Sequence, residues 1–142
     1  MTTPTEPMSA EIKAIQHAYT ALNRNDIVGF MSLFSPDVER FESFGVPQAR
    51  TYQGFEAVKA HVESGRSTWA EGKCEPKAFR VSGDWVFVYV HVRVRLKIET
   101  DWREGDVVDV FRYRDGKATR FASFVDETAA FEWAGVKASE TH

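Results

Sequence analysis

The feature that most constrains the fold is the segment from Asp106 to Asp126, DVVDVFRYRDGKATRFASFVD. Residues typical of β-strands stand on both sides of the Asp115-Gly116 pair, and this pair favours the tight turn that joins two antiparallel strands. The segment therefore predicts a β-hairpin. Asp109 is unusual within it, because valines and aromatic residues surround it. Its carboxyl lies either on a solvated strand face or in an apolar pocket, where burial would raise its pKa.

The turn of this hairpin has two possible lengths, which give the return strand opposite faces. With a two-residue type I′ turn, the residues that join Asp109 on its face are Arg120, Ala122 and Phe124. With a three-residue turn that begins at Arg114, the residues of that face are Asp109, Phe111, Tyr113, Phe121, Ser123 and Val125. The second set is the more typical of a pocket wall.

Length and charge restrict the class of protein. A chain of 142 residues suits a single domain with its own core. A net charge of -3 gives no electrostatic basis for binding nucleic acid or an anionic membrane, so neither is an expected partner.

Cys74 is the single cysteine, which excludes an internal disulfide and fits a reducing compartment. No apolar run approaches the ~20 residues of a membrane span. We expect residues 1–8 to be a disordered lead-in, and the protein to be cytoplasmic.

The first half of the chain has helical periodicity. Ser9 is a candidate N-cap for a first helix whose apolar residues recur three or four positions apart as far as Leu22. Asp26 can cap a second, short helix that Pro36 ends. Gly54 begins a third helix, after a short strand over 37–44 and a loop over 45–53.

The second half has a period of two, which predicts strands over 77–82 and 85–100 before the hairpin. Three helices followed by an antiparallel sheet define an α+β fold. The long strand has two apolar faces at its start, and each face needs a cover. The helices can cover one face, and a second subunit is the simplest cover for the other. We therefore expect a homodimer through the face that carries Val86, Val88, Val90 and Val92.

Common catalytic and metal-binding motifs are absent, and the four histidines are too scattered to predict a metal site. What remains is a set of polar residues in otherwise apolar segments. Each of them alone is more often a surface or paired core residue than a functional one. They become a candidate site only if the fold brings them to one cavity. They are Glu42, His61, Tyr89, His91, Arg93 and Asp109.

Three features resemble the SnoaL-like, ketosteroid-isomerase-like branch of the NTF2-like superfamily. They are ALNRNDIVGFMSLFSPDVERFE near the start, Gly54 at the third helix, and DVFRYRDGKATRF near the end. The resemblance implies one domain over 9–135, followed by a tail over 136–142. It also implies an NTF2-like cone, in which three N-terminal helices pack against a curved, mostly antiparallel sheet and enclose an apolar pocket. Proteins of this kind are usually dimers.

The resemblance also suggests site residues. Glu42 corresponds to the general base of the isomerase, and Asp109 to its oxyanion-hole acid. Ala18 stands where the isomerase has an oxyanion tyrosine. Tyr19 is next to it, but one helical step is a rotation of about 100°, which would point its side chain elsewhere. The residues that we expect to contact a ligand are Tyr19, His61, Trp69, Tyr89, His91, Arg93, Phe111 and Phe121.

Two classes of function follow from the resemblance. The first is a small-molecule enzyme that needs no cofactor and performs acid/base chemistry beside a carbonyl of an apolar or polycyclic substrate, by isomerisation, cyclisation or hydrolysis. Epoxide hydrolysis ranks lower, because Arg93 and Asp109 are available but a second strand aspartate is not. The alternative is a non-catalytic ligand-binding or assembly domain, in which Glu42 and Asp109 are only paired with neighbours.

Overall fold

The computed structural model describes residues 8–42 and 50–142. The expected lead-in therefore lies almost entirely outside the described residues, as does most of the expected loop over 45–53. The elements are α1 (Ser9–Asn23), α2 (Ile27–Met31), β1 (Phe34–Glu42), β2 (Arg50–Gln53), α3 (Phe55–Ser67), β3 (Trp69–Ser82), β4 (Trp85–Leu96), β5 (Arg103–Arg114), β6 (Lys117–Phe124), α4 (Glu127–Ala134) and a 3-10 turn over Ala138–Glu140.

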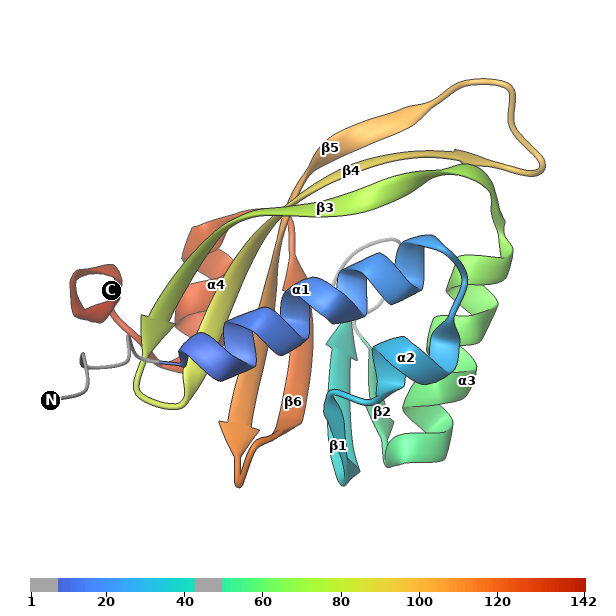
Figure 1. Cartoon of the computed structure of the whole chain (residues 1–142). Coiled ribbons are helices and arrows are strands. Elements are labelled where there is room, and N and C mark those ends of the chain that lie inside the picture. Colours follow the sequence, from blue (N-terminus) through green and yellow to red (C-terminus); the bar gives the residue numbers. More distant parts are fainter. Residues whose placement is uncertain (1–7, 43–49) are drawn as a thin grey trace, which may run out of the picture.

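The strands form one sheet of six, in the order β2-β1-β6-β5-β4-β3. The β1–β6 pair is parallel and the other pairs are antiparallel. Helices α1, α2 and α3 lie on one face of this sheet, and β3, β4 and β5 bend across α1 (Figure 1). The predicted α+β class, with N-terminal helices packed against a curved sheet, is confirmed (Figure 1). No described helix combines the length and the apolar character that a membrane span requires.

A fourth helix, α4, was not predicted, and it covers the other face of the sheet (Figure 1). Asp126 is its N-cap, with a side chain that accepts a hydrogen bond from the backbone N–H of Ala129 at 2.8 Å. Gly135 ends the helix in the left-handed conformation, at φ 71°. The segment of eight residues is too short for a clear helical period, which is why the sequence pattern did not reveal it.

The valine face of β4 is covered by the helices of the same chain. Val86, Val88 and Val90 are at most 2% exposed and pack in one core with Ile15 of α1 and Val58 of α3, while Val92 is partly buried against that core. The prediction of a dimer interface through these valines is therefore wrong. The amphipathic helix α1 needs an apolar surface to cover its own buried side, and this face of β4 supplies it.

The opposite face of the sheet has a second, smaller core under α4. It contains Phe87, Val110, Ala122 and Phe124 from the sheet and Phe131 from the helix. The odd-numbered aromatic positions of β4 thus also have a cover within the chain. Both apolar faces of the long strand are accounted for without a second subunit at the valines.

The hairpin turn combines the two alternatives that the sequence left open. Asp115 and Gly116 both have positive φ, at 52° and 79°, and form the two-residue turn. A bulge then adds one residue at Thr119, because Tyr113 pairs with Ala118 but Arg112 pairs with Arg120. The bulge restores the face expected from the longer turn. The cross-strand pairs of that face are Asp109–Ser123 and Phe111–Phe121.

Strand β3 begins at Trp69 rather than at Lys77. Two irregularities, near Trp69 and at Pro76, interrupt its pairing with β4 and hide the period of two. Gly72 allows the close approach of the strands, since a Cβ at this position would lie 2.3 Å from the carbonyl oxygen of Arg93. At its far end, Val81 exchanges two backbone hydrogen bonds with His142.

Candidate active site

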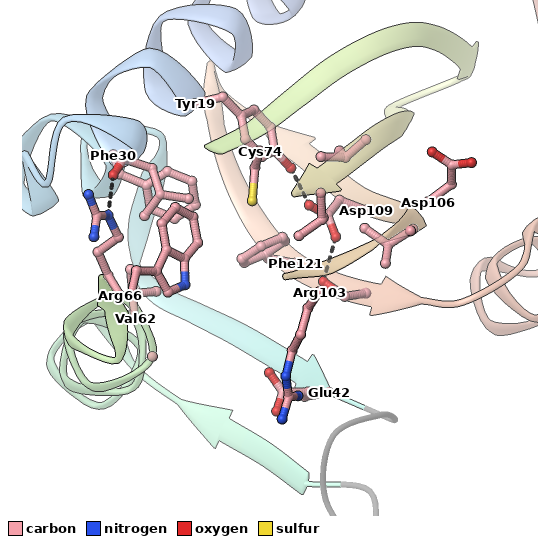
Figure 2. Close-up of a pocket in the computed structure, with 18 of the residues that line it drawn as sticks. Tyr19, Phe30, Glu42, Val62, Arg66, Cys74, Arg103, Asp106, Asp109 and Phe121 are labelled. Atoms are coloured by element: carbon pink, nitrogen blue, oxygen red, sulfur yellow. Dashed lines mark hydrogen bonds between the residues drawn. The ribbon is translucent and has the colours of Figure 1, made fainter. Parts of the chain in front are cut away.

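A cavity of about 580 Å³ lies between the three N-terminal helices and the sheet. Most of its wall is apolar, and its polar side chains come from separate elements that the fold brings together (Figure 2). Glu42 and Asp109, which are far apart in the sequence, both line it. Other residues that line it include Tyr19, Leu22, Phe30, Arg40, His61, Val62, Arg66, Trp69, Cys74, Val90, Val92, Phe121 and Ser123.

Asp109 is 7% exposed, and both of its carboxylate oxygens accept hydrogen bonds. Tyr19 of α1 donates to Oδ2, as Figure 2 shows, and Ser123 of β6 donates to Oδ1 at 2.5 Å. The Ser123 contact follows directly from the hairpin register, because Ser123 is the cross-strand partner of Asp109. Asp109 is thus held in the cavity by hydroxyl groups on two sides.

The expectation that Tyr19 points away from this site is wrong. The buried stripe of α1 comprises Ile15, Ala18 and Tyr19, with Leu22 beside the cavity. Such a stripe spans about 100° or more of the helix surface, so two consecutive residues can both face the sheet. Ala18 packs in the core, and the adjacent Tyr19 supplies the phenol that Ala18 lacks.

Glu42 lies at the end of β1, in a half-buried position near the edge of the cavity. Its Oε2 atom is 3.0 Å from Nε2 of His61 and accepts a hydrogen bond from Nη2 of Arg40 at 3.3 Å. The His61 ring stacks on Tyr52 of β2, with ring centroids 4.0 Å apart. Glu42 and His61 form a dyad whose histidine also lines the cavity.

Arg40 connects the two carboxyl groups. Its Nη1 donates to the hydroxyl oxygen of Ser123 at 2.8 Å, while its Nη2 contacts Glu42. A continuous chain of polar groups therefore runs from Tyr19 through Asp109, Ser123 and Arg40 to Glu42 and His61. Arg40 is 7% exposed, and its guanidinium lies over the ring of Phe121, 4.0 Å from the ring centroid.

Arg40 was not among the predicted site residues, although the sequence contains a signal for it. Side chains two positions apart in a strand share a face. Val38 is fully buried, and Arg40 and Glu42 follow it at that spacing. An inward-facing Val38 thus implies an inward-facing arginine.

The two carboxyl groups have opposite pKa shifts. Burial raises the pKa of Asp109 above its ordinary value, and the positive charge of Arg40 and the hydrogen bonds from Ser123 and Tyr19 oppose that rise. The hydrogen bond with His61 is the main cause that lowers the pKa of Glu42, and the charge of Arg40 adds to it. Burial and the neighbouring Asp109 raise the pKa of Tyr19 well above its ordinary value, so Tyr19 remains a donor.

Three of the predicted ligand contacts lie on the opposite face of the sheet, and their expected place in the cavity wall is wrong. Tyr89 donates to Glu127 of α4 at 2.6 Å, and His91 contacts Asp106 at 2.7 Å and Glu104 at 2.8 Å. Arg93 lies over Trp102, 3.9 Å from the ring centroid. The alternating strand places these odd positions away from the valines that line the cavity. Arg93 and Asp109, considered together for epoxide hydrolysis, are therefore on different faces.

The other predicted contacts are nearer to the cavity. Tyr19, His61, Trp69 and Phe121 line it, and their role in binding remains a prediction. Phe111 is fully buried behind Phe121 and stacks on it, with centroids 4.8 Å apart. In residues 8–42 and 50–142, no group of three or more histidine, cysteine or acidic side chains is arranged to hold a metal ion.

Comparison with solved structures shows where this architecture recurs. An NTF2-like protein of unknown function from Burkholderia pseudomallei superimposes with a TM-score of 0.73 at 24% identity, over 88% of this chain and 97% of the other. TerC, co-crystallised with polyporic acid, superimposes with a TM-score of 0.70 at 29% identity, over 87% of this chain and 97% of the other. A protein with a ketosteroid isomerase-like fold from Catenulispora acidiphila superimposes with a TM-score of 0.71 at 12% identity, over 89% of this chain and 95% of the other.

Among curated proteins, no sequence matches this chain. The model of the SnoaL-like domain family matches residues 15–121, which include Tyr19, Glu42 and Asp109. This match spans most of the chain and agrees with the architecture of the sheet and helices. The chain belongs to the SnoaL-like domain family.

Proposed function

We propose that this protein is a small-molecule enzyme that performs acid/base chemistry beside a carbonyl group, by isomerisation or cyclisation, without a cofactor. The observation that carries this proposal is the pair of carboxyl groups in one largely apolar cavity, with pKa values shifted in opposite directions. Two titratable groups whose environments separate their pKa values are suited to opposite roles in proton transfer.

Glu42 is the proposed base. It is ionised at neutral pH, and His61 both contacts it and lines the cavity. The dyad can remove a proton from a carbon next to a carbonyl, and His61 keeps the carboxylate in a fixed orientation. A positioned acid or base of this kind typically contributes about 10²–10⁴-fold to the rate.

Asp109 and Tyr19 form the proposed electrophilic end. An aspartic acid that is protonated in an apolar site can donate a hydrogen bond to a developing enolate oxygen, as in the resembled isomerase. Tyr19 and Ser123 hold the Asp109 carboxyl in place from two sides. In an isomerisation, the proton that Glu42 removes from one carbon returns to another carbon of the substrate, so the reaction needs no net proton donor.

The wall of the cavity favours an apolar, planar ligand. Phe30, Trp69 and Phe121 contribute aromatic rings, and Val90 and Val92 contribute aliphatic surface. A volume of about 580 Å³ is within the range of about 300–1,000 Å³ that small-molecule sites occupy. The similarity to TerC, which was co-crystallised with polyporic acid, supports an aromatic ligand of this kind.

The test is turnover of a panel of cyclic ketones and aromatic polyketones by the variants Glu42→Gln and Asp109→Asn. Each substitution removes one partner in proton transfer and is expected to lower kcat by about 100-fold or more. Glu39→Gln is the matched control on the same strand, because Glu39 pairs with Arg120 and does not line the cavity. Turnover that survives unchanged in both site variants would falsify the catalytic role of this pair.

A non-catalytic ligand-binding domain is the second candidate. The observation in its favour is that both carboxyl groups already have partners within the chain, namely Tyr19 and Ser123 for Asp109, and Arg40 and His61 for Glu42. Such a domain would bind members of the same panel with measurable heat in calorimetry and convert none of them. Turnover of any member above the rate in buffer would reject this candidate.

A further inference from the structure

The charged side chains of the cavity are unevenly paired. Three of them, Arg103, Glu104 and Asp106, have partners that do not line the cavity. Arg103 forms a two-bond fork with Glu99, with both contacts at 2.8 Å. The carboxylates of Glu104 and Asp106 contact His91 on the opposite face of the sheet. In the described part of the chain, the other charged residues that line the cavity are Arg40, Glu42, Arg66 and Asp109.

Arg66 has no carboxylate partner among the described residues. Its Nε donates to the carbonyl oxygen of Leu22 at 2.8 Å, and its Nη2 donates to that of Asn23 at 2.9 Å. These contacts explain part of its role, because a cation stabilises the C-terminal end of a helix such as α1. They use two of the five N–H groups of a guanidinium and leave its charge uncompensated by any acid. The same guanidinium lies 4.5 Å from the ring centroid of Trp69, which also lines the cavity.

Arg40 contributes a second, more deeply buried cation. Its Nη atoms contact Ser123, Phe41 and Glu42, but its buried Nε–H has no hydrogen-bond partner among the described residues. A buried donor without an acceptor costs about 1–3 kcal/mol. Arg40 lines the cavity, so the charge of its guanidinium group acts on a ligand bound there.

Arg40 is paired with Glu42, whereas Arg66 has no carboxylate partner among the described residues. The paired groups therefore leave the positive charge of Arg66 without compensation. A largely apolar cavity strengthens this imbalance, because a low local dielectric constant increases the interaction between a ligand charge and fixed charges.

We propose that the cavity selects a planar organic acid with one delocalised negative charge, such as an ionised enol, phenol or hydroxyquinone. Its ring system packs against Phe121 and Trp69, and its anionic oxygen is stabilised by Arg40 and Arg66. This inference rests on the proposed function in that it places the ligand in the same cavity, and it adds the charge of that ligand. A neutral hydrocarbon or ketone would leave the Arg66 guanidinium without that compensation.

The test compares two probes of nearly equal size by calorimetry with the purified full chain. The first probe, 2-hydroxy-1,4-naphthoquinone, is an anion at neutral pH, and the second, 2-methoxy-1,4-naphthoquinone, is neutral. We expect the anion to bind about tenfold or more tightly than the neutral ether. Equal affinities, tighter binding of the ether or no binding of either probe would overturn the inference.

Two substitutions at Arg66 identify the source of the preference. Arg66→Gln is expected to reduce the ratio of affinities to about threefold or less, whereas Arg66→Lys, which retains the charge, is expected to keep most of it. Arg114→Gln is the control, because Arg114 is exposed at the hairpin turn and does not line the cavity. A ratio that stays at tenfold in Arg66→Gln contradicts the role of Arg66.

The result separates this inference from the proposed function. If the anion is preferred but Glu42→Gln and Asp109→Asn leave turnover unchanged, the cavity binds organic acids and the catalytic proposal fails. If those variants lose turnover of a neutral ketone while the two probes bind equally, the catalytic proposal stands and the inference about ligand charge fails.

Discussion

The two ends of the cavity carry the same functional group in different surroundings. Asp109 is nearly inaccessible, and hydroxyl groups are its hydrogen-bond partners. Glu42 is half-buried, and its partners are a guanidinium and an imidazole. Burial dominates at the first end and raises the pKa, whereas the hydrogen bond from His61 and the nearby charge of Arg40 dominate at the second end and lower it.

This difference shows how a fold can assign opposite roles to two acids. The assignment depends on which elements meet each carboxyl, and not on the residue type. Arg40 is the exception to this separation, because it contacts Glu42 directly and Asp109 through Ser123. A test of the comparison therefore begins with Arg40.

The largest effect is expected for Arg40→Met. Removal of one partner from a buried ion pair typically costs about 3–5 kcal/mol, because the remaining charge is left uncompensated. We expect the free energy of unfolding to fall by about 3 kcal/mol, the lower end of that range, since His61 still contacts Glu42. Urea denaturation at neutral pH measures this change.

The double variant Arg40→Met/Glu42→Gln is the internal control for that loss. It removes both charges, so it should be more stable than Arg40→Met alone. If the second substitution instead adds its own full loss, the two side chains do not interact and the connection through Arg40 is wrong.

The next effect concerns pH, where the two ends should behave oppositely. Asp109 has a raised pKa in the folded state, so its contribution to stability is present below its ordinary value of 3.8 and is lost as the pH rises through the folded pKa. Glu42 has a lowered pKa, so its contribution is present above its ordinary value of 4.5 and is lost as the pH falls through the folded pKa.

Asp109→Asn should therefore become more stable relative to the wild type as the pH rises. The expected gain is about 1 kcal/mol, which is within the range of a typical single stabilising substitution. Glu42→Gln should lose stability at neutral pH, and the loss should disappear in acid. Urea denaturation between pH 2 and pH 8 checks both curves. Parallel curves for the two variants would show that the environments do not differ as described.

The sequence was informative where its local pattern was regular. The Asp115-Gly116 pair and the alternating valines of β4 predicted the hairpin and the long strand. The resemblance to a known family placed Glu42 and Asp109 together, and both line the cavity. The sequence left two faces open for Asp109, and a bulge at Thr119 selects the one with Phe121 and Ser123.

The failures share one physical cause, which is that a one-dimensional pattern does not show what covers a surface. The helix α4 is too short to have a clear period, so its cover over one face of the sheet was not seen and the valines were assigned to a partner. Tyr19 was rejected as a replacement for the oxyanion tyrosine from a single angle, although a buried helical stripe is wide enough for two neighbours. Tyr89, His91 and Arg93 were chosen for their chemistry, but alternation along β4 places them away from the valines that line the cavity.

The smallest effect is expected at Tyr52, which supports only the Glu42 end. Its ring stacks on His61 with an angle of 17° between the planes, and such an aromatic contact contributes about 0.5–1.5 kcal/mol. Tyr52→Leu should lower the free energy of unfolding by that amount and free the imidazole to turn.

Because the hydrogen bond with His61 is the main cause that lowers the pKa of Glu42, the pKa of Glu42 should rise in Tyr52→Leu, while the pKa of Asp109 should not change. NMR titration of the two carboxyl carbons checks this, with the exposed neighbour Thr51→Ala as the control. Equal shifts at both carboxyls would mean that the polar chain through Arg40 transmits the change, and that the two ends titrate as one unit.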